Sequence, residues 1–475
     1  MKYETVIGLE VHAELSTKSK AFCGCPNEFG KPENTQCCPI CTGMPGVLPV
    51  LNKKVVDYCI KAGLATNCKI TPYGKQDRKN YFYADLPKAY QISQYDLPIC
   101  KDGYVEIKVG DETKRIGITR IHIEEDAGKL MHDPHGGTRV DLNRCGVPLI
   151  EIVTEPDMRS PEEAYIFLET LKSILLYIGV SDCKMEEGSL RCDINLSVRP
   201  VGQKEYGTRT EMKNVNSFSA ALRAMQYERD RQIEVLEEGG VIEQETRRWD
   251  DERGESYAMR NKEDAQDYRY FPDPDLMPIV IDEEWVERIR QTLPELPHKK
   301  RERYKEEYGL PDYDAQFITN SKKLADFFEE CISYGSDPKT VSNWIMGDIS
   351  KMLNDLELSP EEIPFPAKYL SDMLALIESG KISNTIGKKI LKFMFSENKS
   401  PDVIVKEHNL IQISDEGAIL ELVKDVLAKN EKSVNDYKSG KTNAFGFLVG
   451  QCMKASQGKA NPQIINKLLK ELLDK

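Results

Sequence analysis

The sequence predicts an α+β protein in which a mixed α/β N-terminal domain precedes two small all-α domains. Up to about residue 290, short segments alternate polar and apolar residues or are rich in β-branched residues, and glycine or proline turns separate them. Prolines then gather in FPDPDLMP and LPELP, and beyond them apolar residues recur with helical spacing. We therefore predict domains at residues 1–295, 296–404 and 405–475.

The individual elements follow from the same patterns. Strands are expected in the alternating segments TVIGLEVHAEL, YVEIKV, RIGITRIHIEE, PLIEIV and RCDINLSVRP. A helix is expected after Ser160, which suits its cap, while Pro161 suits its first turn and Glu163 the capping-box position. Gly179 suits the end of that helix. A second helix is expected from Ser217 to about Leu236, and short packed helices are expected beyond residue 300.

Composition limits the class of protein. The 475-residue chain has 40% hydrophobic and 30% charged residues, which is typical of globular proteins. No run approaches the roughly 20 apolar residues of a membrane span, and the start, MKYETVIGLEVH, does not resemble a signal peptide. We expect a cytoplasmic protein without membrane contact. The formal net charge of −13 argues against non-specific binding of duplexes, but not against a shaped RNA that meets one basic face.

Four of the 13 cysteines have the spacing of a zinc site. The stretch FCGCPNEFGKPENTQCCPIC can surround one tetrahedral Zn²⁺ with the thiolates of Cys23, Cys25, Cys38 and Cys41. Four protein ligands leave no position open for water, so zinc in this knuckle at residues 23–41 would be structural. Cys37 is then left over. The alternative is that these residues are redox-active or free thiols.

Acidic residues interrupt several apolar strands. Glu10 and His12 are two residues apart, so they project from one face of their strand, and Asp193 and Glu151 interrupt two further strands. Carboxylates and an imidazole that converge on one sheet face need a cation. Mg²⁺ suits this place because it takes oxygen ligands and leaves positions for phosphate oxygens. The alternative is that each segment is an ordinary solvated strand face.

The stretch RIHIEEDAGK contains three adjacent acids, and strand parity does not settle which of them reaches a cation. Glu124 shares a face with His122, whereas Glu125 shares the other face with Ile123 unless the strand bulges. The segment DRKNYFYADLPKAYQISQ can offer the Lys79 ammonium to a phosphate and its rings to a base, or it is a tyrosine-rich core loop. Because the chain has no G-x-x-x-x-G-K-[ST] loop and no G-x-G-x-x-G turn, a nucleotide would bind in another way.

Together these segments resemble the GatB family, the B subunit of the aspartyl/glutamyl-tRNA(Asn/Gln) amidotransferase, over essentially the whole chain. The resemblance is carried, in order, by ETVIGLEVHAEL, DRKNYFYADLPKAYQISQ, RIHIEEDAGK, VDLNRCGVPLIEIVTEPD, KMEEGSLRCDINLSVRP, EMKNVNSF, QETRRWD, DYRYFPDPD and FLVGQCMKASQGKANP. It implies a cradle domain whose β-sheet holds an ATP- and Mg²⁺-dependent kinase site. A helical domain and a small YqeY-like tail domain that binds tRNA would follow.

The resemblance also implies a reaction. ATP phosphorylates the side-chain carboxylate of Glu-tRNA(Gln) or Asp-tRNA(Asn), and ammonia then displaces the phosphate to give Gln-tRNA(Gln) or Asn-tRNA(Asn). The chain would thus be part of a carbon–nitrogen ligase that takes its amide nitrogen from glutamine. A glutaminase, the A subunit, is implied as the source of ammonia, because this sequence shows no amidase-like Ser-Ser-Lys stretch. A small C subunit would complete the heterotrimer.

Carried onto this sequence, the resemblance implies roles for particular residues. His12, Glu125 and Glu151 would bind Mg²⁺, and the choice of Glu125 over Glu124 comes from the family alone. The catalytic groups would be Glu10, Lys79, Asp193 and Lys213, of which the first three would bind the nucleotide. The four cysteines match the zinc-bearing members of the family. Because other members lack these cysteines, zinc would not be catalytic.

The resemblance gives the basic tail a role in tRNA binding. From Lys438 to Lys475 there are seven lysines against two acids, a local charge of about +5. Lys441, Lys454 and Lys459 would meet backbone phosphates, while Gly446 and Gly450 would keep the segment flexible for docking. The alternative is a solvated, lysine-rich helix pair.

Two other interpretations stay open. One is the archaeal relative that makes only Gln-tRNA(Gln), although it carries an inserted domain for which this length leaves little room. The other is a non-catalytic tRNA-binding scaffold with a zinc ribbon, in which Glu10, Glu125 and Glu151 are structural. Binding of Mg-ATP separates the scaffold from the enzyme.

Overall fold

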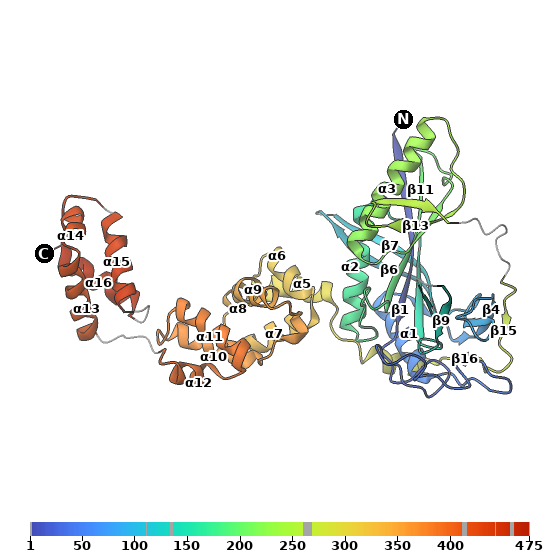
Figure 1. Cartoon of the computed structure of the whole chain (residues 1–475), viewed down its shortest axis with the longest axis horizontal. Coiled ribbons are helices and arrows are strands. Elements are labelled where there is room, and N and C mark those ends of the chain that lie inside the picture. Colours follow the sequence, from blue (N-terminus) through green and yellow to red (C-terminus); the bar gives the residue numbers. More distant parts are fainter. Residues whose placement is uncertain are drawn as a thin grey trace. The chain divides into compact units, whose positions relative to one another are not determined.

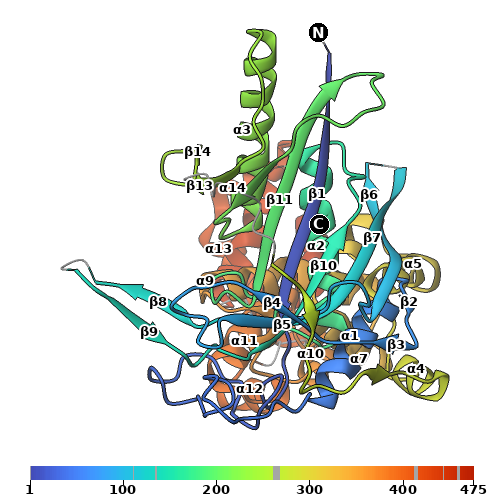
Figure 2. The same cartoon turned by 90° about the vertical axis from the view of Figure 1, so that its right-hand side faces the viewer.

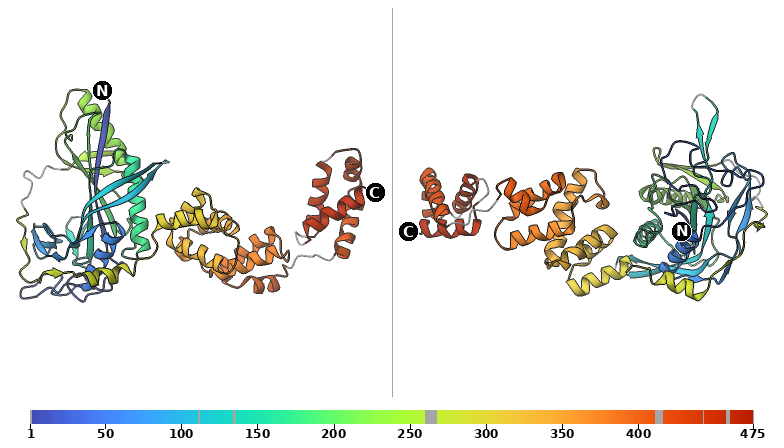
Figure 3. Two further views of the ribbon diagram at one scale, coloured as in Figure 1. Left: turned by 180° about the vertical axis from the view of Figure 1, so that it is seen from behind. Right: turned by 90° about the horizontal axis from the view of Figure 1, so that it is seen from below.

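A computed structural model of the chain describes residues 2–110, 112–133, 136–259, 268–410, 416–441, 443–456 and 460–474. The chain forms two compact units, Met1–Leu296 and Pro297–Lys475. The first unit combines a large sheet with helices, and the regular elements described in the second are all helical (Figures 1 and 3). The predicted α+β class is confirmed. The first unit ends next to the predicted division at 295/296, and the division at 404/405 stays a prediction.

Nine of the described strands form one sheet, in which each strand is antiparallel to its neighbours except where β12 meets β13. In spatial order these strands are β14 (Glu255–Ala258), β13 (Thr246–Asp250), β12 (Thr210–Lys213), β11 (Leu190–Pro200), β1 (Tyr3–Glu14), β10 (Pro148–Thr154), β7 (Glu112–Glu125), β6 (Cys100–Val109) and β2 (Lys69–Ile70). The long strands β1 and β11 lie side by side at its centre (Figure 2). Strands predicted far apart in the sequence therefore become direct neighbours.

Helices cover one face of this sheet. The helices α1 (Lys53–Ala65), α2 (Pro161–Tyr177) and α3 (Phe218–Glu237) contact its strands. Ile7, Leu9 and Val11 of β1 are at most 1% exposed and share one core with Phe167 of α2. Because side chains alternate along a strand, Glu10 and His12 are turned to the opposite face. The acids that interrupt the strands therefore lie on the face away from the helices.

The ends of the two predicted helices agree with their sequence signals. Ser160 Oγ accepts a hydrogen bond from the Glu163 amide at 3.1 Å, Pro161 begins α2, and Gly179 has a positive φ of 66° just beyond it. The capping box is not closed as predicted, because the Glu163 carboxylate accepts from the Arg159 amide instead of that of Ser160. Ser217 caps α3 in the same manner as Ser160 caps α2.

Smaller elements complete the first unit. They are the three-stranded sheet β15 (Phe271–Pro272), β4 (Asp77–Asn80) and β5 (Tyr90–Ser93), the pair β16 (Ile279–Val280) and β3 (Tyr73–Gly74), the hairpin β8 (Lys129–His132) and β9 (Thr138–Asp141), and α4 (Glu283–Arg290). Strand β5 contacts β7 of the large sheet. This contact brings the predicted basic and aromatic segment to the face that carries the acids.

The second unit is built from short helices, as the proline punctuation predicts. They are α5 (Pro297–Tyr308), α6 (Asp312–Thr319), α7 (Lys322–Ser333), α8 (Pro338–Trp344), a π-helix (Ile345–Ile349), α9 (Ser350–Asp355), a 3₁₀ turn (Pro360–Glu362), α10 (Ala367–Glu378), α11 (Asn384–Glu397), α12 (Pro401–Glu407), α13 (Glu416–Lys429), α14 (Glu431–Lys438), α15 (Asn443–Ala455) and α16 (Pro462–Leu473). No helix among the described residues combines the length and apolar character needed to cross a bilayer.

The tail differs from the prediction in one respect. Gly446 and Gly450, expected in a flexible segment, lie inside α15. This helix buries Leu448 and Cys452, four residues apart, in a core shared with α13 and α16. Packing of that apolar stripe outweighs the low helix propensity of the two glycines.

Candidate active site and metal centre

A row of ionisable side chains crosses the sheet face away from the helices. Cross-strand register sets His12 of β1 beside Glu151 of β10, and Glu151 beside His122 of β7. Glu124 follows His122 by two residues and so faces the same side. His12 Nε2 lies 3.4 Å from Glu151 Oε2, and His122 Nε2 lies 3.3 Å from both Glu151 Oε2 and Glu124 Oε1. The structure therefore brings four groups together from three neighbouring strands.

This group fits a divalent cation. One ligand atom each from His12, Glu124 and Glu151 lie within 4.8 Å of one another. The Glu124 carboxylate is oriented by Ser93 Oγ, which donates to it at 2.7 Å, and by Gln91 Nε2 at 3.3 Å. Two carboxylates and one imidazole, backed by such outer contacts, are a donor set that suits Mg²⁺.

The two carboxylates stay ionised despite their burial. Burial alone would raise the pKa of Glu151, but the imidazoles of His122 and His12 hold that pKa well below its usual range. Burial alone would lower the pKa of His122, but Glu151 and Glu124 raise it to about 9. Without a metal, the charges of the carboxylates are thus balanced by imidazoles, and both carboxylates remain available as anionic ligands.

The three adjacent acids at the end of β7 point to three different cations. Glu124 meets the imidazole of His122 at 3.3 Å. Glu125 accepts a hydrogen bond from Lys88, and Asp126 pairs with Arg191. Each carboxylate therefore has its own counter-charge, which is how one short stretch accommodates three buried acids.

The predicted ligand Glu125 does not lie with His12 and Glu151. Strand β7 runs to Glu125 in regular register with β10, and the shift in their pairing occurs at the far end, at Val153/Thr154. Alternation along an unbulged strand therefore turns Glu125 away from the face of Glu124. Glu125 instead accepts from the Ile92 amide at 2.9 Å and lines a pocket of about 100 Å³ beside the cysteine loop. Glu124 occupies the place that the prediction gave to Glu125.

A second acidic group lies next to the first on the same face. Glu10 and Asp193 are cross-strand partners, and ligand atoms of Glu10, Asp193 and Glu211 lie within 4.8 Å of one another. Lys213 Nζ donates to Asp193 at 2.6 Å and to Glu211 at 2.9 Å, while Asn195 donates to Glu10 at 3.0 Å. The predicted residues Glu10, Asp193 and Lys213 are thus brought together. Here a lysine neutralises the acids.

Lys79 reaches the first group from β4. Its ammonium lies 4.9 Å from the ring centre of Tyr268 and 6.0 Å from that of Tyr81. Burial alone would lower its pKa, but Glu124 and Glu151 raise it above its usual value. Aromatic rings and nearby carboxylates thus hold a charged, largely desolvated ammonium, which suits a phosphate group.

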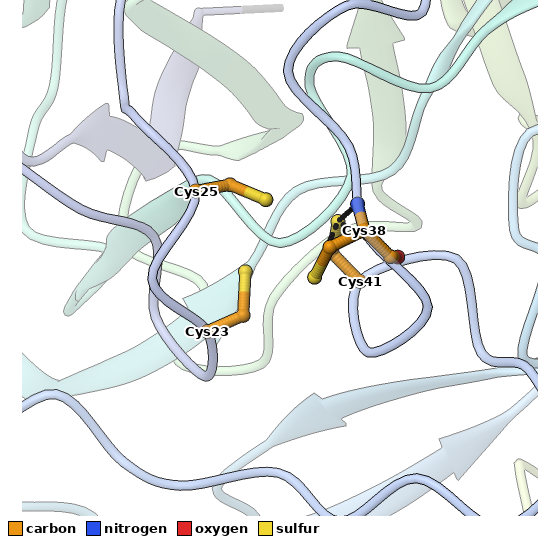
Figure 4. A group of neighbouring side chains, drawn as sticks. All are labelled: Cys23, Cys25, Cys38 and Cys41. Carbon is orange, nitrogen blue, oxygen red and sulfur yellow. Dashed lines mark hydrogen bonds between the residues drawn. The ribbon is translucent and has the colours of Figure 1, made fainter.

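The four predicted zinc ligands converge from two turns (Figure 4). Their sulfur atoms lie within 4.8 Å of one another, with 3.9 Å between those of Cys38 and Cys41. A hydrogen bond from Cys23 lowers the pKa of Cys41 to about 4. The buried Lys20 ammonium lies 3.6 Å from the Cys41 sulfur. This donor set fits a tetrahedral structural metal. Cys37 lies outside it, and its thiol donates a hydrogen bond to the Asn34 carbonyl.

Serine at Cys38 or Cys41 is expected to abolish zinc binding, because three thiolates hold the ion much less tightly than four. Serine at Cys37 is the matched control, since it changes a neighbouring thiol outside the group, and it is expected to leave the zinc content unchanged. The measurement is metal content per purified chain by mass spectrometry. Equal zinc loss in all three variants would contradict this assignment.

The structure describes two of the three predicted tRNA-binding lysines. Lys441 is exposed and pairs with Asp436 at 2.8 Å, and Lys454 is exposed in the last turn of α15. Lys459 lies outside the described residues. The two described lysines are thus accessible to a nucleic acid.

Arg191 and Glu211 of this face were not singled out from the sequence, and His122 was named there only as sharing a face with Glu124. His122 and Arg191 stand two residues from Glu124 and Asp193, so strand parity was a usable signal for both. Glu211 stands two residues before Lys213 on the short strand β12 and had no comparable signal. Only the fold brings Glu211 to Glu10.

Comparison with known proteins agrees with this geometry. The family model described as "GatB/GatE catalytic domain" matches residues 5–287, and that described as "GatB domain" matches residues 326–473. The chain belongs to the GatB family.

Full-length relatives carry the name of this family. A protein of Caldicellulosiruptor bescii, named as the B subunit of aspartyl/glutamyl-tRNA(Asn/Gln) amidotransferase, is 64% identical, with 100% of both chains covered. Proteins of the same name from Thermoanaerobacter sp. and Lachnoclostridium phytofermentans are 61% and 59% identical over 100% of this chain and 100% and 99% of their own. The GatB catalytic-domain match covers both acidic groups and the cysteine knuckle.

Proposed function

We propose that this chain is the B subunit of a tRNA-dependent amidotransferase and carries its kinase site. The observation that supports this most is the pairing of two acidic groups with Lys79 and Lys213 on one face of the sheet. Phosphoryl transfer requires charges that neutralise and align phosphates more than it requires covalent chemistry by the protein. The name shared by the relatives supplies the substrate, a tRNA that carries Asp or Glu.

The reaction proceeds in two steps. A side-chain carboxylate oxygen of the aminoacyl group bonds to the γ-phosphorus of ATP as ADP leaves, because a carboxylate itself is a poor acyl donor. Ammonia then attacks the carbonyl carbon of the acyl phosphate, inorganic phosphate leaves, and the nitrogen loses a proton. The products are Gln-tRNA(Gln), Asn-tRNA(Asn) or both. The chain is thus part of a carbon–nitrogen ligase with glutamine as the nitrogen donor.

The residues of the face have distinct tasks in this proposal. His12, Glu124 and Glu151 would hold Mg²⁺, which when bound supplies positive charge for phosphate oxygens. Lys79 binds phosphate from above the face, and Lys213, held by Asp193 and Glu211, presents a second ammonium. Glu10, hydrogen-bonded by Asn195, belongs to the second group and stands on β1 two residues from His12 of the first. Zinc at the four cysteines would stabilise the loop that contains them and take no part in the chemistry.

The partners follow from the chemistry and from the family. Ammonia would come from a glutaminase, the A subunit, and a small C subunit would complete a heterotrimer. A reducing, cytoplasmic compartment suits a chain in which all 13 cysteines are free thiols. The exposed tail lysines Lys441 and Lys454, together with Lys459, would contact phosphates of the tRNA.

The test is amide formation by the complex reconstituted from this chain, the glutaminase and the small third protein. Asp-tRNA(Asn) and Glu-tRNA(Gln) are offered separately, with ATP, Mg²⁺ and glutamine, and the aminoacyl product is identified after release from the tRNA. Formation of Asn, Gln or both, with one ADP per amide, is the expected result. A complex that binds these tRNAs but neither consumes ATP nor forms amide would favour the scaffold interpretation.

Alanine at both Lys441 and Lys454 is expected to weaken binding of misacylated tRNA and to raise its KM, with kcat little changed. Each lost phosphate contact makes the dependence of log Kd on log salt shallower by about one. The measurement is tRNA affinity at several salt concentrations. Alanine at Lys322 and Lys368, lysines whose side chains are 43% and 51% exposed and that also pair with an aspartate, is the matched control. An unchanged salt dependence of tRNA affinity in the Lys441/Lys454 variant would contradict the proposal that the tail contacts the tRNA.

A further inference from the structure

Arg191 stands between the two acidic groups of the face. On β11 it is the direct cross-strand partner of His12 and precedes Asp193 by two residues, so its side chain shares the face that carries the acids. His12 belongs to the first group and Asp193 to the second. A guanidinium at this position acts on the proposed Mg²⁺ ligand His12 and on Asp193, the carboxylate that pairs with Lys213.

The guanidinium is fixed in place, and within the part of the chain that the structure describes only two of its five N–H donors are used. Its two terminal nitrogens engage Asp126, with Nη1 at 3.4 Å from Oδ1. Asp126 is itself held, since its Oδ1 accepts from the Ala127 amide at 2.9 Å and its Oδ2 lies 3.7 Å from Arg144 Nε. Among the described residues, the buried Arg191 Nε has no hydrogen-bond partner. That atom is shielded from solvent, so a ligand would instead meet the N–H groups of the two terminal nitrogens that do not face Asp126, on a side chain that is 37% exposed.

We propose that Arg191 is a catalytic residue of the phosphoryl transfer, whose guanidinium donates a hydrogen bond to an oxygen of the γ-phosphoryl group. This inference rests on the proposed function. In the step concerned, a carboxylate oxygen bonds to the γ-phosphorus while the bond from that phosphorus to the β,γ-bridging oxygen breaks, and its electron pair leaves on ADP. Negative charge is spread over the oxygens of the group in transfer, and a guanidinium fixed by Asp126 stabilises it without rearrangement.

The competing explanation is structural. Arg191 would then do no more than neutralise Asp126 together with Arg144, and its removal would impair the enzyme by leaving a buried carboxylate with a weaker counter-charge. The two explanations predict different rates for one double variant. Removal of both charges, in Arg191→Met/Asp126→Asn, restores neutrality without restoring the guanidinium.

The experiment uses the whole heterotrimer with Mg-ATP and misacylated tRNA. Arg191→Met is expected to lower kcat for amide formation by about 10³-fold or more, the scale seen where an arginine serves phosphoryl transfer. Mg-ATP binding, measured by calorimetry, and the KM for ATP change only a few-fold. The melting temperature falls in Arg191→Met and recovers in Arg191→Met/Asp126→Asn, whereas kcat stays low in both. Arg191→Lys keeps the charge but not the planar set of guanidinium donors, and it too stays slow.

The matched control is Arg199→Met, which removes another arginine of β11, one that donates to Glu4 at 2.7 Å. Its kcat is expected to stay near that of the wild type. Recovery of kcat in the double variant, or a loss confined to binding of ATP or tRNA, would overturn the role of Arg191. Failure of the wild-type complex to couple ATP to amide formation would instead refute the proposed function itself.

Discussion

Glutamine at Glu124 is expected to lower the rate of ATP-dependent amide formation by roughly three orders of magnitude. Glu124 lies with His12 and Glu151 in the group that fits a divalent cation, and it is oriented by Ser93 and Gln91. A metal ion is worth several kcal/mol to such a transition state, and each ~1.4 kcal/mol is a factor of ten in rate. The measurement is the rate at saturating ATP as Mg²⁺ is varied, where the variant also needs more Mg²⁺.

The matched control is the neighbouring acid. Glu125→Gln removes a carboxylate that pairs with Lys88 and accepts from the Ile92 amide, away from His12 and Glu151. We expect it to leave the Mg²⁺ dependence of the rate unchanged, whatever it does to other steps. The reverse pattern, with Mg²⁺ dependence altered by Glu125→Gln and not by Glu124→Gln, would refute the assignment of the ligand to Glu124.

The fold was predictable where local signals are strong. Alternation along the five predicted strands and the cap at Ser160 depend on neighbouring residues, so the sequence contains them directly. The helix through Gly446 and Gly450 was missed because its stability comes from Leu448 and Cys452, which pack against α13 and α16. Propensity alone does not register such tertiary packing.

The candidate site was predictable in its residue types and much less in its geometry. Parity placed Glu10 with His12 and Glu124 with His122, and the structure agrees with both. Which strands become neighbours is a tertiary property. The contacts of Glu151 with His122, and of Lys213 with Asp193, therefore had no signal in one sequence.

The lack of a tertiary signal in one sequence also explains why Glu125 was predicted as a Mg²⁺ ligand. The family resemblance pointed to Glu125, and parity could not contradict it as long as a bulge was open. The regular pairing of β7 with β10 up to Glu125 closes that possibility in the structure. One local geometric fact is therefore the basis for proposing Glu124, and not the chemically identical Glu125, as the ligand.

Methionine at Lys79 is expected to reduce kcat by about 10²–10³-fold, the usual loss when one donor to a developing charge is removed. Methionine keeps the length and apolar stem that pack beside Tyr268 and removes only the charge. The measurement is amide formation at saturating substrates. Lys69→Met, at an exposed lysine that pairs with Asp102 in the same unit, is the matched control and is expected to have little effect.

The pH dependence of the rate distinguishes a Lys79 that stays positively charged from a Lys79 that accepts a proton. Glu124 and Glu151 raise the pKa of Lys79 above its usual value despite its burial, so its ammonium keeps its proton throughout the neutral range and up to pH 9. Lys79→Met is therefore expected to lower the rate by the same factor at every pH between 7 and 9. If Lys79 accepted a proton instead, the wild-type rate would rise with pH in that range and the variant would lose the rise. A change in the shape of the profile would thus exclude Lys79 as a fixed positive charge and with it the electrostatic role that the acid-bearing face gives this lysine.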